Sequence, residues 1–79
     1  MDISLAAQLE SVLRKAAGEE TSLTSMTVDY GASDVGDDLE SKSWVERATK
    51  SLVFVQAELR RADGGLAASA SAIFRRAGN

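Results

Sequence analysis

The spacing of apolar residues changes once along this chain, at Gly18, and the change limits the folds open to it. From Asp2 to Ala17, apolar side chains recur every three or four residues, as on one face of a helix. They are Leu5, Ala6, Leu9, Val12, Leu13 and Ala16. Asp2 is expected to cap the start of this helix and Gly18 to end it. After Gly18 the spacing becomes two, the period of a strand with one buried face.

The period of two predicts four strands, over Leu23–Tyr30, Leu39–Arg47, Ser51–Arg61 and Leu66–Arg76. Within each strand, the alternation places one set of residues on one face: Thr24, Met26, Val28 and Tyr30; Leu39, Ser41, Ser43 and Val45; Val53, Val55, Ala57 and Leu59; and Ala68, Ala70, Ala72 and Phe74. Alanine and serine in the last strand leave room for close packing of the helix, or for a ligand.

The connections between the predicted strands are short, and Ala62-Asp63-Gly64-Gly65 reads as a tight hairpin turn because Asp-Gly accepts positive φ. Short links favour antiparallel neighbours, since parallel pairs need a long crossover. The prediction is one α+β domain over residues 1–79. In it, one helix packs on a four-stranded antiparallel meander.

The composition of the 79 residues excludes several function classes, because the chain has no cysteine and no histidine. Disulfide frameworks, Cys/His zinc sites and histidine-based nucleophiles therefore fall away. The net charge of −3 disfavours nucleic acid as a partner. No apolar run is long enough for a membrane span and no secretory signal is recognisable, so a cytoplasmic protein is expected. Three carboxylates lack the spacing of a calcium loop, so no metal is expected; they are Asp34, Asp37 and Asp38.

The order of several short motifs resembles the C-terminal half of hot-dog-fold acyl-CoA thioesterases, particularly the phenylacetate-pathway type. These motifs are Val28-Asp29-Tyr30, Gly36-Asp37-Asp38-Leu39, the Asp63-Gly64 turn and the small-residue strand ending near Phe74. The resemblance implies a hot-dog-like domain with a central helix on the sheet. Relative to the family, this chain lacks the usual first two strands and the His-Gly-Gly turn before the helix. It also lacks the Leu-Arg-Pro that often follows the position of Tyr30.

The resemblance also implies site residues. The segment Ala6–Glu10 matches the stretch that carries the family's catalytic carboxylate, so Glu10 becomes the candidate acid/base or nucleophile. Backbone N–H groups at the helix N-terminus would polarise the thioester carbonyl. The alternative is that Glu10 forms an ordinary helix-surface ion pair with Arg14, four residues on.

Two pairs of arginines are candidates for holding the phosphates of coenzyme A, which as part of the substrate is the only cofactor implied. They are Arg60-Arg61 and Arg75-Arg76, and they are expected to lie close together if their strands pair. The alternative is that they are solvated charges that keep the strand ends soluble.

A chain this short is expected to oligomerise, because its own core is small. Hot-dog domains generally work as dimers, and the resemblance implies a dimer through the edge strand Leu23–Tyr30, with a second exposed edge at Leu39–Arg47. Tyr30 and Trp44 are expected to pack. Two functions stay open: an acyl-CoA thioesterase-like protein that hydrolyses or binds its ligand at the dimer interface, or a non-catalytic oligomerisation or binding module.

Overall fold

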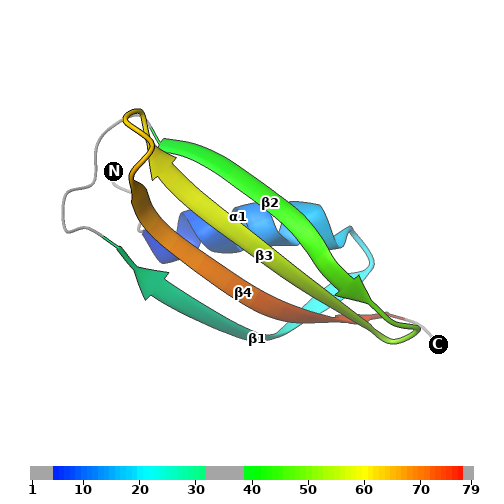
Figure 1. The fold of residues 1–79 in the computed structure, drawn as a ribbon. Helices are drawn as coiled ribbons and strands as arrows, with labels where there is room; N and C mark the ends of the chain where they lie inside the picture. Colours follow the sequence, from blue (N-terminus) through cyan, green and yellow to red (C-terminus); the bar gives the residue numbers. More distant parts are fainter. Residues whose placement is uncertain (1–4, 32–38, 78–79) are drawn as a thin grey trace.

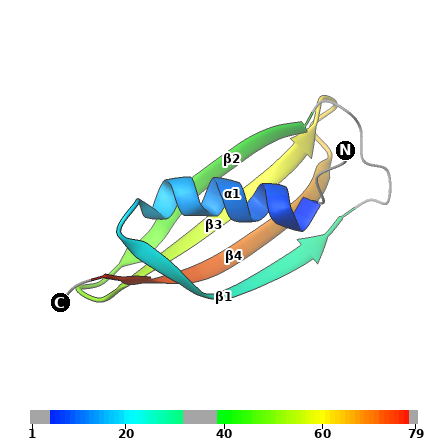
Figure 2. The ribbon, with the colours of Figure 1, turned by 180° about the vertical axis from the view of Figure 1, so that it is seen from behind.

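A computed structural model of the chain describes residues 5–31 and 39–77. These residues form one helix, α1 (Leu5–Ala17), and four strands: β1 (Thr21–Tyr30), β2 (Leu39–Ala48), β3 (Leu52–Arg61) and β4 (Leu66–Arg76). The helix lies along one face of a single antiparallel sheet (Figures 1 and 2). The prediction of an α+β fold with one helix on four antiparallel strands is confirmed. The predicted cap at Asp2 and the acidic loop lie outside the described residues.

Helix α1 is held on the sheet by its apolar stripe. Leu9 and Leu13 are fully buried, and each such side chain contributes about 1.5–3 kcal/mol by leaving water. The helix ends where predicted, because Gly18 adopts a positive φ of 103°. Its N–H donates to the carbonyl of Arg14 at 3.1 Å, which closes the last turn. No helix in the described part of the chain has both the length and the apolar character needed to cross a membrane.

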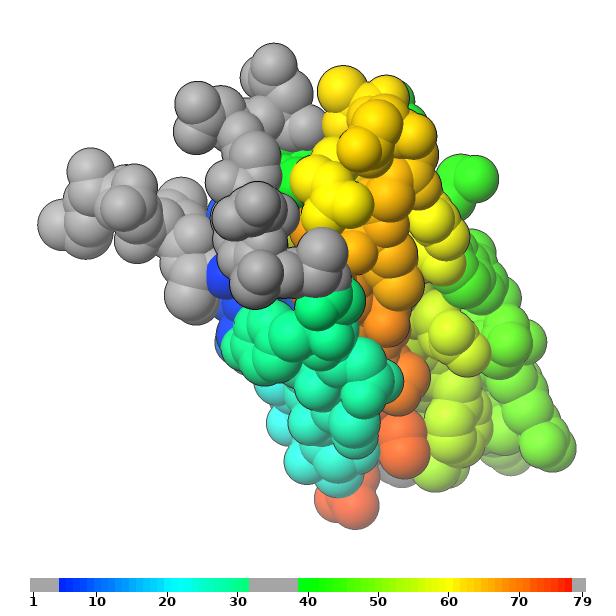
Figure 3. Space-filling view, turned by 60° about the vertical axis from the view of Figure 1, so that its left-hand side comes forward, coloured from blue at the N-terminus to red at the C-terminus, as the bar shows by residue number. Residues whose placement is uncertain are grey.

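The strands follow the order β1-β4-β3-β2, which corrects the predicted meander. Strands β2, β3 and β4 do form a meander, but β1 pairs with β4 instead of with β2. The physical reason is burial: β3 and β4 carry the most continuous apolar faces and take the centre. The serine- and charge-rich strands are left at the two edges. Both edges implied by the resemblance, at β1 and at β2, are therefore sheet edges here (Figure 3).

The core lies between α1 and the two central strands. One of the two predicted alternating sets of each strand is buried there: Val53, Val55, Ala57, Leu59, Ala68, Ala70, Ala72 and Phe74. Ala67, from the other set of β4, is buried as well. Ala57 faces Ala70 and Val55 faces Ala72 across the β3–β4 ladder, so small side chains form the floor beneath the helix. The sheet surface turned away from α1, which we call the open face, carries residues such as Phe54, Gln56, Ser71 and Ile73.

Strand β1 departs from the predicted alternation at Thr24. Leu23 pairs with Phe74 and Ser25 with Ile73, so Thr24 is the extra residue of a β-bulge. Leu23, not Thr24, therefore packs against the core, and Thr24 is exposed. Met26 and Val28 pack as predicted. Tyr30, which was expected to pack, is instead 65% exposed at the end of this edge strand.

Candidate functional site

The candidate acid/base, Glu10, lies in the middle of α1 and forms an ion pair within the helix. Its Oε2 accepts hydrogen bonds from Arg14 Nε at 2.8 Å and is 2.7 Å from Arg14 Nη2. The Glu10 side chain is 40% exposed and that of Arg14 is 50% exposed. The geometry is the helix-surface pair that the sequence allowed as an alternative.

A groove on one side of α1 shows on which side of the helix Glu10 lies. Between α1 and β2 lies a groove of about 360 Å³, lined by Ala7, Gln8, Ser11, Val12, Leu39, Ser41 and Leu59. Glu10 follows Gln8 by two residues, so it points about 200° away from it around the helix. Glu10 therefore lies on the flank turned from β2 and towards the side of β4 and β1.

The two arginine pairs lie at opposite ends of the β3–β4 hairpin, which corrects the expectation that they meet. Arg60 faces Leu66 beside the turn, whereas Arg75 faces Leu52 at the far end. In an antiparallel hairpin, residues meet only when they are equally distant from the turn. The eight residues from Leu52 to Arg60 span roughly 27 Å at strand rise, so both pairs cannot hold one phosphate.

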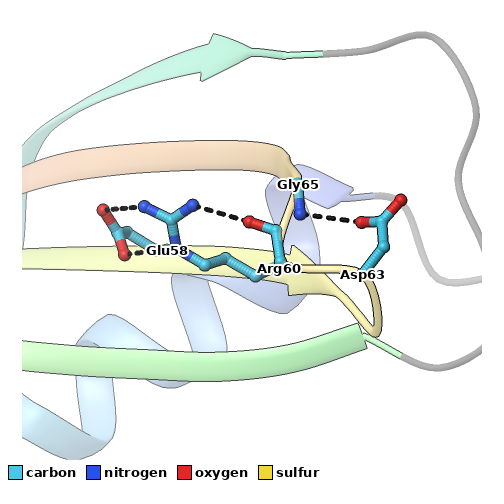
Figure 4. A network of polar contacts seen from close by, with 5 residues as sticks. Glu58, Arg60, Asp63 and Gly65 are labelled. Carbon is cyan, nitrogen blue, oxygen red and sulfur yellow. Dashed lines mark hydrogen bonds and ion pairs between the residues drawn. The ribbon is translucent and has the colours of Figure 1, made fainter.

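Arg60 is already engaged by its own hairpin (Figure 4). Its Nε and Nη2 donate to the two carboxylate oxygens of Glu58 at 3.1 and 3.2 Å, a bidentate contact. Its Nη1 donates to the carbonyl of Gly64 at 3.0 Å. The guanidinium thus ties the strand to its turn, which is a structural role.

Arg61 follows Arg60 on β3, so its side chain lies on the opposite face of the sheet, where it contacts Asp63 in the turn. Its Nε lies 3.6 Å from Asp63 Oδ1, and the same oxygen accepts the N–H of Gly65 at 2.8 Å. The N–H of Gly65, and then the charge of Arg61, lower the pKa of Asp63 below its ordinary value of 3.8. Arg61 Nη1 is buried and has no hydrogen-bond partner among the described residues. A Cβ at Gly65 would meet the Arg61 guanidinium, which would have to move to make room for it.

At the other end of the sheet, Arg75 and Arg76 lie beside the beginning of β1. They face Ser22 and Thr21, respectively. Arg76 Nε donates to the carbonyl of Thr49 at 3.2 Å. Within the described ranges, the Arg75 side chain forms no hydrogen bond or ion pair and is exposed. Among the described contacts, Arg75 thus keeps all its side-chain donors available to an anion, and Arg76 keeps its two Nη groups.

One polar cluster escaped the sequence reasoning. Glu46 accepts the indole N–H of Trp44 at 3.2 Å and the side-chain amide of Gln56 at 3.3 Å. It borders a hollow of about 250 Å³ on the open face, shared with Phe54 and Ile73 among others. The spacing of two between Trp44 and Glu46 places both side chains on one face of a strand, and this was a usable signal in the sequence. The bulge after Val45 breaks the alternation of the strand and makes that signal hard to recognise.

Comparison of the chain with protein-family models, with curated proteins and with solved structures finds no match. Within residues 5–31 and 39–77, no three carboxylates gather closely enough to hold a metal ion. The three acidic residues weighed as a calcium loop fall outside those ranges. The site must therefore be judged on the geometry of Glu10, the two arginine pairs and the sheet edges.

Proposed function

We propose that the chain is a hot-dog-like domain of the thioesterase superfamily, without that family's usual first two strands, which binds an acyl-CoA thioester between two subunits. The observation that carries the proposal is the strand order β1-β4-β3-β2 beneath one helix. It leaves the strand after the helix at one edge and Leu39–Ala48 at the other, as the resemblance implies. The proposed compartment is the cytoplasm, in keeping with a chain that has no cysteine.

Subunit contact is proposed to occur through β1. This edge strand presents unpaired backbone groups, and Tyr30 is 65% exposed at its end. Pairing of β1 with the β1 of a second copy would cover that aromatic ring and continue the sheet. It would also bring the second copy to the side of α1 on which Glu10 lies, so the bound thioester would contact both subunits.

Hydrolysis at this interface would use Glu10 as the general base. Water would add to the thioester carbonyl carbon while its proton passes to Glu10. The C–S bond would then break, and coenzyme A would leave as a thiol after taking that proton. The Glu10 side chain is 40% exposed in the single chain. Burial of Glu10 by the second copy would support this role, because electrostatic interactions of the base with the reacting groups are stronger when bulk water is excluded.

Among the arginines, Arg75 and Arg76 are the proposed contacts for the phosphates of coenzyme A. They lie on β4 beside β1, the strand at which the second copy is proposed to join. Arg60 and Arg61 fit this role less well, because Glu58 and Gly64 already occupy the donors of Arg60, and the unpartnered Nη1 of Arg61 is buried.

A second candidate is a non-catalytic binding or oligomerisation module that keeps the sheet. The ion pair between Glu10 and Arg14 favours it, since both charges are satisfied within one exposed helix turn. In this case the chain would bind coenzyme A thioesters, or only itself, without turning them over.

The test is a panel of acyl-CoA thioesters, with release of the coenzyme A thiol measured by a thiol reagent. The protein itself gives no background, because it has no cysteine. For the catalytic form, Glu10→Gln is expected to lower kcat by about 100-fold or more with little change in KM. The matched control Glu19→Gln, an exposed residue just beyond α1, should leave turnover unchanged.

Binding is measured in parallel by calorimetry with the non-hydrolysable coenzyme A itself. Arg75→Ala should weaken binding by about tenfold or more, the loss expected for one charge-assisted contact, whereas Arg60→Ala should not. Binding without turnover supports the module. Neither binding nor turnover across the panel would overturn the acyl-CoA proposal.

A further inference from the structure

The outer edge of β2 is open to a further strand. Among the strands that the structure describes, β2 pairs only with β3 and forms one edge of the sheet (Figure 1). Val45, on this strand, is 47% exposed. An edge of this kind carries a row of unpaired N–H and C=O groups that can join another strand. The side chains of β2 determine which strand can pair with this edge.

The charges of β2 are arranged so that the strand complements itself. Two copies of an antiparallel strand related by a two-fold axis place each residue opposite one at an equal distance on the other side of the axis. With the axis at Trp44, Lys42 of one copy faces Glu46 of the other, and the contact occurs twice. Ser43 then faces Val45, so a small side chain meets the exposed valine.

Other positions of the axis are less favourable. An axis through a charged residue places that residue opposite its own copy, and an axis at Ser43 places Glu40 opposite Glu46. An axis at Val45 brings no opposite charges together. An axis at Ser41 pairs Glu40 with Lys42 but joins residues 39–43 and leaves the exposed Val45 outside the ladder. The axis at Trp44 joins residues 42–46, and the register shift between Val45 and Arg47 ends the regular ladder there. The register centred on Trp44 is thus the one that pairs opposite charges and also covers Val45.

The two charged groups are also prepared for this contact. Lys42 faces Glu58 on β3, but Glu58 is held by Arg60 in the bidentate pair. In the described part of the chain, the Lys42 side chain has no hydrogen bond or ion pair, and it is exposed. Glu46 is fixed by Trp44 and Gln56, one donor on each carboxylate oxygen, so its position is set before a partner arrives.

We propose that two copies of the chain associate through β2, antiparallel and centred on Trp44, to form one continuous eight-stranded sheet. The two indole rings would lie opposite each other at the axis, flanked on both sides by a Lys42–Glu46 pair. Aromatic pairs and opposite charges across strands both stabilise such a ladder. This contact lies on the opposite edge from β1, and it does not depend on the acyl-CoA proposal.

Disulfide trapping tests the register. In the cysteine-free chain, Trp44→Cys would place one thiol opposite its own copy, with Cα atoms about 4.5–5.5 Å apart, within the range of a disulfide. Under mild oxidation it should become mostly a covalent dimer. Val45→Cys is the control: it is on the same strand, but its own copy lies beyond about 7 Å, so it should cross-link slowly. Equal trapping of the two variants would overturn the register.

Charge exchange tests the contact in the chain that keeps Trp44. Lys42→Glu should weaken this association by about tenfold, because each of the two pairs becomes repulsive. The double variant Lys42→Glu with Glu46→Lys should regain part of the association, because both cross-strand pairs become attractive again while Trp44 and Gln56 lose their acceptor. Circular dichroism should show all variants folded, since both side chains are exposed. An association that is unchanged by Lys42→Glu, or a β2 edge occupied only by a different protein, would overturn the proposal.

Discussion

At the scale of single residues, Asp63 stabilises the hairpin turn between β3 and β4. Its carboxylate accepts the N–H of Gly65 at 2.8 Å, and Gly64 beside it has a positive φ of 91°. The Asp63 side chain itself is 72% exposed. The turn is therefore stabilised by a hydrogen bond and a backbone preference, with little burial.

The lowered pKa of Asp63 predicts a pH-dependent contribution to stability. A group whose folded pKa is depressed stabilises the fold above its unfolded pKa, here near 3.8, and loses this effect as the pH falls through the lower folded pKa. Asp63→Ala should therefore lower Tm at pH 7, and the difference from the unchanged protein should narrow below about pH 4. Thermal unfolding followed from pH 2 to pH 7 would check this. Asp63→Asn is the control, because it keeps an acceptor for Gly65; a Tm difference for Asp63→Ala that is constant with pH would contradict the prediction.

The residue scale also shows why the arginines were placed wrongly from the sequence. Arg60-Arg61 and Arg75-Arg76 end consecutive strands, which suggested a shared position. The number of residues between each arginine and the Asp63-Gly64 turn shows that the pairs lie apart, since Arg60 is close to the turn and Arg75 is at the far end of its strand. The engagement of Arg60 by Glu58 had no comparable signal, because it depends on side-chain conformations.

At the scale of elements, β4 decides how closely α1 approaches the sheet. Ala68, Ala70 and Ala72 are buried beneath the helix, while Ser71 between them is exposed on the open face. Because these side chains are small, the helix packs close to the strand, and no space remains between them for a larger side chain.

Enlarging this floor is predicted to push the helix away. Ala70→Leu should destabilise the fold by about 1–3 kcal/mol, because the added methyl groups have no space beneath α1. Ser71→Leu makes a comparable increase in side-chain volume one residue later on the open face, and it should change stability by less than about 0.5 kcal/mol. Urea unfolding of both variants gives the comparison. Equal losses would show that α1 does not rest on β4.

The elements were largely predictable because periodicity reports burial on one face. Strand β4 was predicted with the observed bounds, and the alternation of β3 was correct at each buried position. The bulge at Thr24 was not predictable, since its polar side chain fits either face. The place of β1 beside β4 could not be read from connection length, because it depends on which strands bury the most apolar surface.

At the scale of the whole molecule, the two sheet edges lie on opposite sides, and each has a proposed two-fold contact of its own (Figure 3). A single two-fold contact produces a dimer and stops. Two such contacts on one chain extend the assembly until the curvature of the sheet closes it or until concentration becomes limiting.

The two proposed contacts predict that the mass of the assembly in solution falls in steps when one edge, and then both edges, are blocked by substitution. Tyr30→Lys alters the exposed end of β1, and Lys42→Glu alters β2; both side chains are exposed, so the fold should remain intact. Light scattering after size exclusion should give dimers for each single variant and monomers for the double variant, with larger species for the unchanged chain at higher concentration. A monomer of 8.3 kDa for the unchanged chain at micromolar concentration would contradict both contacts.

The position of Trp44 decides what an optical experiment on this molecule observes. It is the only tryptophan of the chain, and it lies half-buried on an edge strand, away from the core around Leu9, Leu13 and Phe74. Its fluorescence therefore reports the detachment of β2, whereas circular dichroism reports the whole backbone. If the edge frays before the core opens, the two signals will give different midpoints from the same sample.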